Sequence, residues 1–343
     1  MKRHLVTAMA LSVGLLGLVG TSASAGVSTR VTAHASVTGA MSATMPLVRL
    51  AFSTPVAAST LPPLAVHPAL LTSWQQIGPR EVQAVANGAI LPVHYVIDVP
   101  TTLSCATRCR VLGVAAHDAS ASVDLTWEDQ LLATLGYLPV TFTPLVATSD
   151  PSQKVPGTYT WTYPQLPASL AGQWRVGSTN VILTGAVMSF QNDHHLATTG
   201  VADAATWNAL VAAVRAGGHA PHPYNYVSVS MASPERLTLY VAGQPRFRTL
   251  VNTGISVSPT ATGTYPVYLR YTSQTMSGTN PDGTHYSDPG IPWVSYFNGG
   301  DALHGFIRAT YGWPQSLGCV EMPFAAAKTI WPSTPIGTLV TVS

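Results

Sequence analysis

The sequence predicts a multidomain α+β protein, with a mostly-β domain at the C-terminus and a small three-helix bundle before it. In the last third, Leu237, Leu239 and Val241 alternate with Thr238 and Tyr240, which is the period of a strand. Between residues 122 and 217, apolar residues recur three and four positions apart, which is the period of a helix. The chain has 343 residues and 46% of them are hydrophobic, so it can bury more than one core.

The charge of the chain excludes one class of partner. Charged residues make up 9% of the sequence, and the formal net charge is +2 at pH 7. The basic residues form no cluster beyond Lys2-Arg3. Because nucleic-acid binding needs a basic surface that neutralises phosphates, we expect no nucleic acid as partner.

The N-terminus has the three parts of a secretory signal peptide. Lys2-Arg3-His4 is basic, residues 5–20 are apolar, and Ala23-Ser24-Ala25 fits a cleavage site. The apolar run is short and interrupted by glycines, so a signal peptide at 1–25 is favoured over an uncleaved membrane anchor. No other segment has the sequence of a membrane span, and we expect a secreted protein.

Composition divides the residues that follow. Residues 26–70 are rich in Ala, Ser, Thr, Val and Pro and carry almost no charge, which predicts a low-complexity spacer. Residues 71–121 contain short strand-like runs and predict a small β-rich region of unknown role. Of the three cysteines, Cys105 and Cys109 are the candidate disulfide, since an odd number in an exported protein suggests one pair and one free thiol. The zinc alternative for this pair lacks partner ligands nearby.

The first helix of the bundle is predicted from about residue 122. Thr126 with Asp129 resembles a capping box, and Gly136 is a candidate C-terminal stop. One face of this helix is apolar: Trp127, Leu131 and Leu135. The second helix is predicted to be capped by Thr184 and the third by Asp203. The third has an apolar face of Trp207, Leu210, Val211 and Val214.

Two segments interrupt or follow the bundle. The insert at 141–180 holds Trp161, Tyr163 and Trp174, which are favoured as the core of a hairpin over a sugar-stacking surface. Residues 218–226 are rich in Pro and Gly and predict a linker. Its two histidines lack a third ligand with metal-site spacing, so no metal site is predicted.

The candidate chemistry lies in the C-terminal domain, predicted over 227–343. His304-Gly305 precedes Cys319 by fifteen positions, close enough for the two side chains to meet across neighbouring strands. A cysteine nucleophile needs a base to form its thiolate, and histidine commonly supplies one. The alternative is that Cys319 is a small buried apolar residue and His304 a core histidine.

These residues belong to four ordered motifs that resemble the L,D-transpeptidase (YkuD) family. The motifs are Val251-Asn252-Thr253-Gly254, the segment 260–265, His304-Gly305 with Ser316-Leu317-Gly318-Cys319-Val320, and the closing strand 336–342. The family pattern has histidine where this chain has Leu317, and Arg or Asn where it has Glu321. We expect both changes to affect substrate contacts.

The resemblance implies a mostly-β sandwich that transfers acyl groups between peptidoglycan stem peptides through a thioester on Cys319. His304 is implied as the base and the Gly305 carbonyl as the group that orients it. The backbone N–H groups of Gly318 and Cys319 are oxyanion candidates. Ser316 either hydrogen-bonds near the site or holds the turn.

Further substrate contacts are predicted from the segment 271–292, which is too long for an ordinary hairpin and predicts an active-site lid. Tyr286 and Trp293 are the candidate contacts, with a plain surface loop and a core Trp293 as the alternative. A short helix is predicted at 324–331.

Residues 122–217 resemble the peptidoglycan-binding domain 1 family through segments at 130–140 and 184–210, including Phe190-Gln191 and Asp203 to Trp207. The expected partner is therefore peptidoglycan, in a cell wall or a periplasm-equivalent space, with no cofactor and no metal. Three functions remain open: a secreted L,D-transpeptidase, which is favoured; an L,D-carboxypeptidase that releases D-Ala to water; and a catalytically silent wall-binding protein.

Overall fold

A computed structural model describes residues 28–34, 46–67, 72–86, 94–100, 111–116 and 125–343. The chain divides into two compact units at residues 124 and 125, and each is described by itself. The signal peptide at 1–25 and the Cys105–Cys109 pair lie outside the described residues. In the described part of the chain, no helix has the length and apolar character needed to cross a membrane.

The first unit is built from strands. They form two antiparallel sheets, ordered β1-β6-β3 and β4-β5-β2-β7. Their bounds are β1 Ser28–His34, β2 Pro46–Phe52, β3 Ala65–His67, β4 Thr72–Gly78, β5 Glu81–Ala86, β6 His94–Pro100 and β7 Val111–Ala116, with a 3-10 turn at Ala58–Thr60.

The expected spacer at 26–70 is wrong where the structure describes it. Strand β2 lies between β5 and β7, and its Leu50 and Phe52 are buried. Small β-branched and apolar residues build this region, so its composition is that of a low-complexity spacer although it forms paired strands. Residues 26–70 and 71–121 therefore contribute strands to the same sheets.

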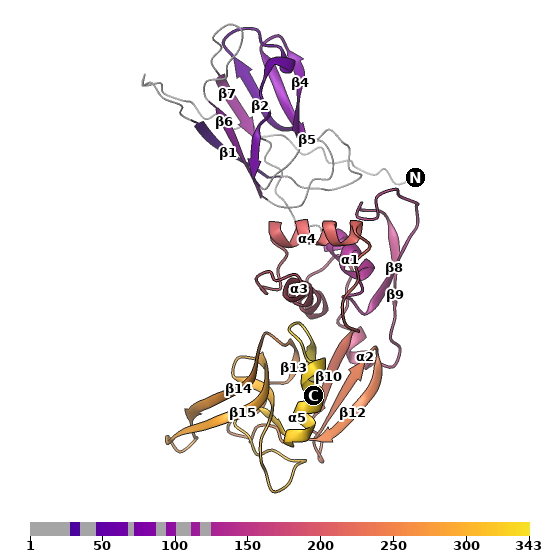
Figure 1. Cartoon of the computed structure of the whole chain (residues 1–343), viewed down its shortest axis with the longest axis vertical. Coiled ribbons are helices and arrows are strands. Elements are labelled where there is room, and N and C mark those ends of the chain that lie inside the picture. Colours follow the sequence, from indigo (N-terminus) through magenta and orange to yellow (C-terminus); the bar gives the residue numbers. More distant parts are fainter. Residues whose placement is uncertain (1–27, 35–45, 68–71, 87–93, 101–110, 117–124) are drawn as a thin grey trace, which may run out of the picture. The chain divides into compact units, whose positions relative to one another are not determined.

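The second unit begins with the helical bundle. Its main helices are α1 Leu125–Thr134, α3 Val181–Asp193 and α4 Ala204–Arg215 (Figure 1). The predicted faces of the first and third helices are buried, and the rings of Trp127 and Trp207 meet at 5.3 Å. Gly136 ends α1 with a φ of 82°, as predicted.

The predicted helix caps are right at one of three positions. Asp203 caps α4, because its Oδ1 accepts a hydrogen bond from the Thr206 N–H at 2.9 Å. Thr126 lies inside α1, and Asp129 accepts from the Gly177 N–H at 2.7 Å instead of forming a capping box. Thr184 lies inside α3, which is capped by Asn180.

The insert at 141–180 contains the predicted hairpin. Strands β8 Val140–Pro144 and β9 Gly157–Trp161 pair antiparallel, and a short helix α2, Ala168–Ala171, follows. The Trp161 Nε1–H donates to the Tyr163 carbonyl at 2.9 Å, and Trp174 packs near Tyr159. These contacts favour hairpin packing over an open sugar-binding surface.

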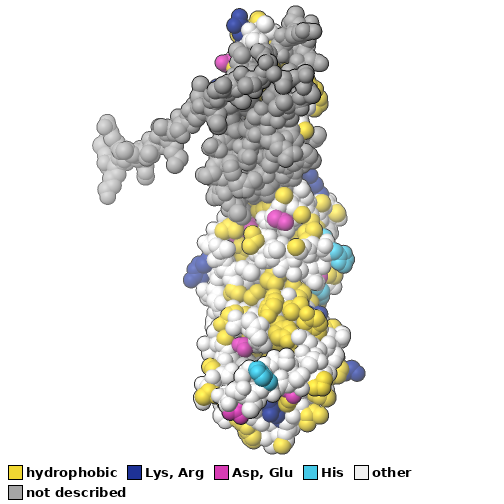
Figure 2. Space-filling model, turned by 90° about the vertical axis from the view of Figure 1, so that its left-hand side faces the viewer, with side chains coloured by type: hydrophobic (Ala, Val, Ile, Leu, Met, Phe, Trp, Pro, Cys, Tyr) yellow, Lys and Arg dark blue, Asp and Glu magenta, His cyan; other side chains and the backbone are white. Residues whose placement is uncertain are grey.

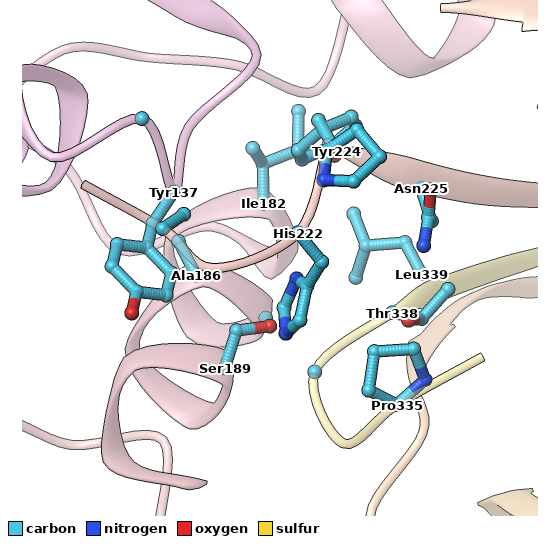
Figure 3. Close-up of a pocket in the computed structure, with 15 residues that line it drawn as sticks. Tyr137, Ile182, Ala186, Ser189, His222, Tyr224, Asn225, Pro335, Thr338 and Leu339 are labelled. Atoms are coloured by element: carbon cyan, nitrogen blue, oxygen red, sulfur yellow. The ribbon is translucent and has the colours of Figure 1, made fainter. Parts of the chain in front are cut away.

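The bundle packs on the C-terminal domain around a small cavity of about 30 Å³. Helix α3 contributes Ser189, whose Oγ donates to the Ile336 carbonyl at 3.0 Å. Figure 3 draws Tyr137, Ser189 and His222 at this cavity, opposite Pro335. His222 belongs to the predicted linker 218–226, so the linker is part of the contact between the two domains.

The C-terminal domain consists of two sheets that pack around one core. The first is ordered β12-β11-β10-β18-β13 and the second β14-β15-β16-β17. Core residues from both include Val227, Leu237, Leu303 and Val320. The strands are β10 Asn225–Ser230, β11 Arg236–Val241, β12 Gln244–Leu250, β13 Gly263–Pro266, β14 Leu269–Thr279, β15 His285–Asn298, β16 Asp301–Gly305, β17 Val320–Met322 and β18 Leu339–Val342. This is the predicted mostly-β fold.

One local prediction in this domain differs from the structure, namely that the segment 271–292 is too long for an ordinary hairpin. The segment 271–292 is a long antiparallel hairpin of β14 and β15, with a bulge between Gln274 and Met276. Its free end projects from the rest of the C-terminal domain (Figure 1). The predicted short helix is α5, Phe324–Ile330, and a 3-10 turn at Trp331–Ser333 follows.

Candidate functional site

His304 and Cys319 line one cavity of about 800 Å³ in the C-terminal domain. Strand β16 supplies His304, and Cys319 directly precedes β17, which pairs with β16 in parallel. This pairing places His304 beside Glu321, two positions after the cysteine. The predicted residues Tyr286, Ser316, Leu317 and Glu321 also line the cavity. The two residues that the spacing predicted to meet therefore line the same cavity.

His304 is held in one orientation. It is 3% exposed, and its Nδ1 lies 3.1 Å from the Gly305 carbonyl oxygen. A carbonyl only accepts, so Nδ1 carries the proton and Nε2 is left as the acceptor. Burial lowers the pKa of His304, although the Gly305 carbonyl and Glu321 act in the opposite direction. The imidazole is therefore neutral at neutral pH and ready to take a proton.

Cys319 is a protonated thiol in this site. Its pKa is raised to about 12, chiefly by burial and to a smaller extent by the carboxylates of Asp301 and Glu321, while the Ala302 backbone N–H acts in the opposite direction. The Sγ lies 3.6 Å from the Gly300 carbonyl oxygen, to which it donates. A neutral thiol and a neutral imidazole therefore occupy the cavity together, instead of a preformed thiolate–imidazolium pair.

The turn before Cys319 is held by Ser316. Its Oγ donates to the Cys319 carbonyl at 2.5 Å and accepts from the Gly318 N–H at 3.2 Å. Gly318 has a φ of 119°, and a Cβ there would lie 2.5 Å from Asp301 Oδ1, so only glycine fits. Because the Gly318 N–H is engaged, it is wrong as an oxyanion donor in this conformation, and the Cys319 N–H is the candidate that remains.

The residues of the upstream motif support this turn. The Ser316 N–H donates to the Thr253 carbonyl, and the Ile255 N–H donates to the Ser316 carbonyl, both at 3.0 Å. Glu235, which is fully buried, accepts from the Thr253 N–H and Oγ1–H at 2.7 Å each. The sequence analysis missed Glu235, because nothing in the sequence around it indicates the long-range contact.

A second missed residue is Arg308, which lies on the cavity wall. Its Nε and Nη2 donate to the two carboxylate oxygens of Glu321 at 2.7 and 2.8 Å. Nη2 also donates to the Gln315 carbonyl at 3.2 Å. Glu321 therefore holds the guanidinium of Arg308 at the cavity wall. The sequence shows an arginine four residues after His304, but nothing in it links that arginine to Glu321.

The hairpin supplies the cavity wall that was predicted as a lid. Tyr286 and Asp288 of β15 and Met276 of β14 line it, together with Tyr296. Trp293 does not line it; its ring packs on the core and on Phe324 at 6.4 Å, as in the core alternative.

The site contains a free thiol and, among the described residues, no cluster of metal ligands. Within the described ranges, no group of three or more His, Cys, Asp or Glu side chains is placed to hold a metal ion. Cys319 is a free cysteine. Figure 2 shows that the face it draws carries few charged side chains on its described surface, in keeping with the low charge of the sequence.

Comparison with protein families identifies both C-terminal regions. Residues 224–342 match the L,D-transpeptidase catalytic domain (YkuD), and residues 177–210 match the model described as "Putative peptidoglycan binding domain". The chain thus contains a region that matches the L,D-transpeptidase catalytic domain, preceded by a region that matches the peptidoglycan-binding model, and the resemblance seen in the motifs is confirmed. No curated protein sequence matched the chain.

Several solved structures resemble parts of the chain. The catalytic domain of the E. faecium L,D-transpeptidase is 25% identical, over 35% of this chain and 96% of that chain, with a TM-score of 0.32. L,D-transpeptidase 3 of Mycobacterium tuberculosis is 12% identical, over 91% and 95%, with a TM-score of 0.33. An L,D-transpeptidase of Mycobacterium smegmatis is 11% identical, over 93% and 100%, with a TM-score of 0.33.

Proposed function

We propose that this chain, with its L,D-transpeptidase catalytic domain, is a secreted cysteine transpeptidase that forms or remodels peptidoglycan cross-links through a thioester on Cys319. The observation that carries the proposal is the shared cavity of His304 and Cys319, with the His304 Nδ1 bonded to the Gly305 carbonyl. A nucleophile that shares a cavity with an oriented base is the arrangement that acyl transfer needs.

In the first half-reaction, the Cys319 thiol gives its proton to His304 Nε2 as the sulfur attacks the carbonyl carbon of stem residue three. The thiol is neutral at rest, so proton transfer and attack are coupled. The Cys319 N–H is the donor that would face the oxyanion. His304 then protonates the leaving amine of D-Ala, and the carbonyl carbon remains bound to sulfur as a thioester.

In the second half-reaction, the amine of a neighbouring stem attacks the thioester carbonyl. His304 Nε2 takes the proton of that amine, and the carbon–sulfur bond breaks. The released thiolate recovers the proton, which restores the resting pair. The Gly305 carbonyl supports both steps, because it keeps Nδ1 protonated and Nε2 available.

The test is incubation with purified disaccharide-tetrapeptide, followed by mass spectrometry. A cross-linked dimer is the expected product, and Cys319→Ala is expected to form none. Tripeptide without dimer would replace transpeptidation by L,D-carboxypeptidase activity, in which water is the second nucleophile. An unchanged substrate would overturn the enzymatic proposal and leave the wall-binding alternative.

A second experiment detects the covalent acyl-enzyme by mass. A carbapenem-type β-lactam is expected to increase the mass of the intact protein by the mass of one β-lactam molecule. The mass of the Cys319→Ala variant is expected to stay unchanged. Because Cys105 and Cys109 are expected to be bridged, peptide mapping should place the adduct on Cys319. An adduct on another residue would contradict the assignment of the nucleophile.

A further inference from the structure

Three tyrosines lead from the cavity to the outer surface of the β14–β15 hairpin. Tyr296 lines the cavity, and its ring centroid lies 6.3 Å from that of Tyr268 and 6.5 Å from that of Tyr271. Tyr268 and Tyr271 are 37% and 40% exposed. We call these three residues the tyrosine row. Exposed aromatic rings that adjoin a cavity indicate a ligand-binding surface.

The tyrosine row borders the end of the cavity at which Cys319 lies. The Tyr268 hydroxyl donates to the Gly299 carbonyl, and the Cys319 thiol donates to the neighbouring carbonyl of Gly300. Strand pairing sets Tyr296 opposite Leu269, so Tyr271 is its diagonal neighbour on the same face of the hairpin. A molecule that extends out of the cavity from Cys319 would therefore pass over these rings.

The three side chains of the tyrosine row are uncharged. Burial raises the pKa of the Tyr268 phenol, and the carboxylate of Asp301 lies close enough to raise it further, by less than burial does. Arg270, which lies between two of its members in sequence, bonds to the Trp331 carbonyl and stacks on the Trp331 ring at 3.8 Å. The rings of Tyr268 and Tyr271 are inclined by 41° and 87° to that of Tyr296, so they form no closed stack. The Tyr271 hydroxyl has no hydrogen-bond partner among the described residues, and it is free to face a ligand.

A ligand that suits this surface has a neutral ring with apolar C–H faces and hydroxyl groups at its edge. Tyrosine offers the complementary parts, an apolar ring and a polar tip. A charged ligand would find no counter-ion among the three side chains. A purely apolar ligand would leave the Tyr271 hydroxyl without a partner. A sugar ring meets both conditions.

We propose that the tyrosine row is a saccharide subsite that holds the glycan nearest to the stem peptide while the peptide occupies the cavity. This rests on the proposed function, because the stem peptide is joined to a sugar in peptidoglycan. Two stem residues separate the attacked residue from the sugar, and an extended chain spans about 7 Å over two residues. Tyr296 lines the cavity, and the ring centroids of Tyr268 and Tyr271 lie 6.3 and 6.5 Å from its own, which is a comparable distance.

The test compares two substrates, the disaccharide-tetrapeptide and the same tetrapeptide without sugars. The wild-type protein is expected to have a KM about tenfold lower for the sugar-bearing substrate, about the size of one aromatic contact. Tyr271→Ala and Tyr271→Leu are expected to bring the ratio of the two KM values to about one. Tyr271→Phe keeps the ring and should keep the ratio.

The matched control is Trp313→Ala, which removes an aromatic side chain that is 46% exposed and outside the tyrosine row. It is expected to leave the KM ratio at its wild-type value. Equal KM values in the wild type would overturn the subsite. A Tyr271→Ala variant that weakens both substrates equally would overturn it as well, because the ring would then contact the peptide.

A separate measurement distinguishes failure of the subsite from failure of the proposed function. The Cys319→Ala protein is mixed with the disaccharide alone, and binding is followed by saturation-transfer NMR. Binding that Tyr271→Ala abolishes supports the subsite even if neither substrate is turned over. No binding, or binding that Tyr271→Ala leaves intact, overturns it. Thermal unfolding of each variant checks that it is folded.

Discussion

Glu321 holds Arg308 by two parallel hydrogen bonds, from Nε to Oε2 at 2.7 Å and from Nη2 to Oε1 at 2.8 Å. The Glu321 side chain is 6% exposed and that of Arg308 is 30% exposed. The departure of position 321 from the family pattern is therefore matched by a cation at position 308. The guanidinium also lies 4.7 Å from the centroid of the Phe306 ring, so its place on the cavity wall is fixed from several sides.

The first prediction concerns this ion pair. Arg308→Ala leaves a buried carboxylate without its partner, and we expect a loss of about 3 kcal/mol in the free energy of unfolding. The double variant Arg308→Ala with Glu321→Gln should recover part of that loss, because the unpaired charge is removed. Urea unfolding of the single and double variants measures the coupling.

The bundle offers a matched control for this measurement. Arg215 and Asp150 form an ion pair at 2.6 Å, but their side chains are 50% and 36% exposed. Arg215→Ala should therefore cost only about 0–1 kcal/mol. An equal cost for Arg308→Ala would mean that burial does not strengthen the cavity pair, contrary to the prediction.

The second prediction concerns the resting thiol. Because burial raises the pKa of Cys319 to about 12, the thiolate fraction should grow about tenfold per pH unit through the neutral range. Alkylation by iodoacetamide should follow this slope from pH 7 to pH 9 without a plateau. Intact-mass kinetics measure it, with Cys319→Ala as the unreactive control. A plateau near pH 7 would indicate a preformed ion pair with His304.

Local sequence signals predicted the elements that depend on neighbouring residues. The Asp203 cap, the end of α1 at Gly136 and the buried face of β11 all arise within a few positions of the chain. The Arg308–Glu321 pair and the support of Thr253 by Glu235 join residues across strands, so they depend on the register of the sheet. Register was not evident from the spacing of the motifs.

The same distinction explains the wrong predictions. Thr184 has a capping side chain, but Asn180 lies at the actual start of α3, where a side-chain oxygen can accept from a free N–H. Residues 26–70 contain strands although their composition suggests a spacer, because paired neighbours and burial decide whether such residues form a sheet. The Gly318 N–H was predicted as an oxyanion donor, but it donates to the Ser316 hydroxyl instead. The sequence does not show this hydrogen bond, because it depends on how the turn folds.

The third prediction concerns pH and the linker. His222 Nε2 lies 3.3 Å from Asp193 Oδ1, and the Tyr137 hydroxyl donates to Asp193 Oδ2 at 3.1 Å. The hydrogen bond and charge of Asp193 raise the pKa of His222, against the effect of burial. Burial alone would raise the pKa of Asp193, but the bonds from His222 and Tyr137 lower it overall.

The sign of each contribution to stability follows from these directions. His222, with a raised pKa, stabilises below its ordinary value of 6.5 and loses this as the pH rises through its folded value. Asp193, with a lowered pKa, stabilises above its ordinary value of 3.8 and loses this as the pH falls through its folded value. The pair therefore contributes fully between pH 3.8 and 6.5. His222→Gln should reduce the difference in Tm between pH 6 and pH 8, and an unchanged difference would contradict the prediction.

The fourth prediction concerns the bundle. Residues 125–222, expressed alone, should sediment with insoluble peptidoglycan, since they contain the segment 177–210 that matches the peptidoglycan-binding model. Trp207→Ala should abolish binding by unfolding the domain, because Trp207 is fully buried against Trp127. If the full chain without this segment binds the wall as well as the intact chain does, the bundle is a spacer.

The last prediction separates the base from its neighbour. His304→Ala should reduce turnover of the disaccharide-tetrapeptide by about 10²–10⁴, because it removes the group that takes the thiol proton. Leu317→His restores the residue of the family pattern at a half-buried position on the cavity wall. The Leu317 carbonyl, not its side chain, accepts the hydrogen bond from Ser258 Oγ at 3.1 Å, so the substitution leaves that support in place. We therefore expect Leu317→His to change kcat/KM only modestly, in either direction.

Near wild-type turnover in His304→Ala would make His304 structural and direct the search for another base to His285, which lies outside the cavity lining in this conformation. Activity that appears only in Leu317→His, with an inert wild type, would establish the silent wall-binding function instead.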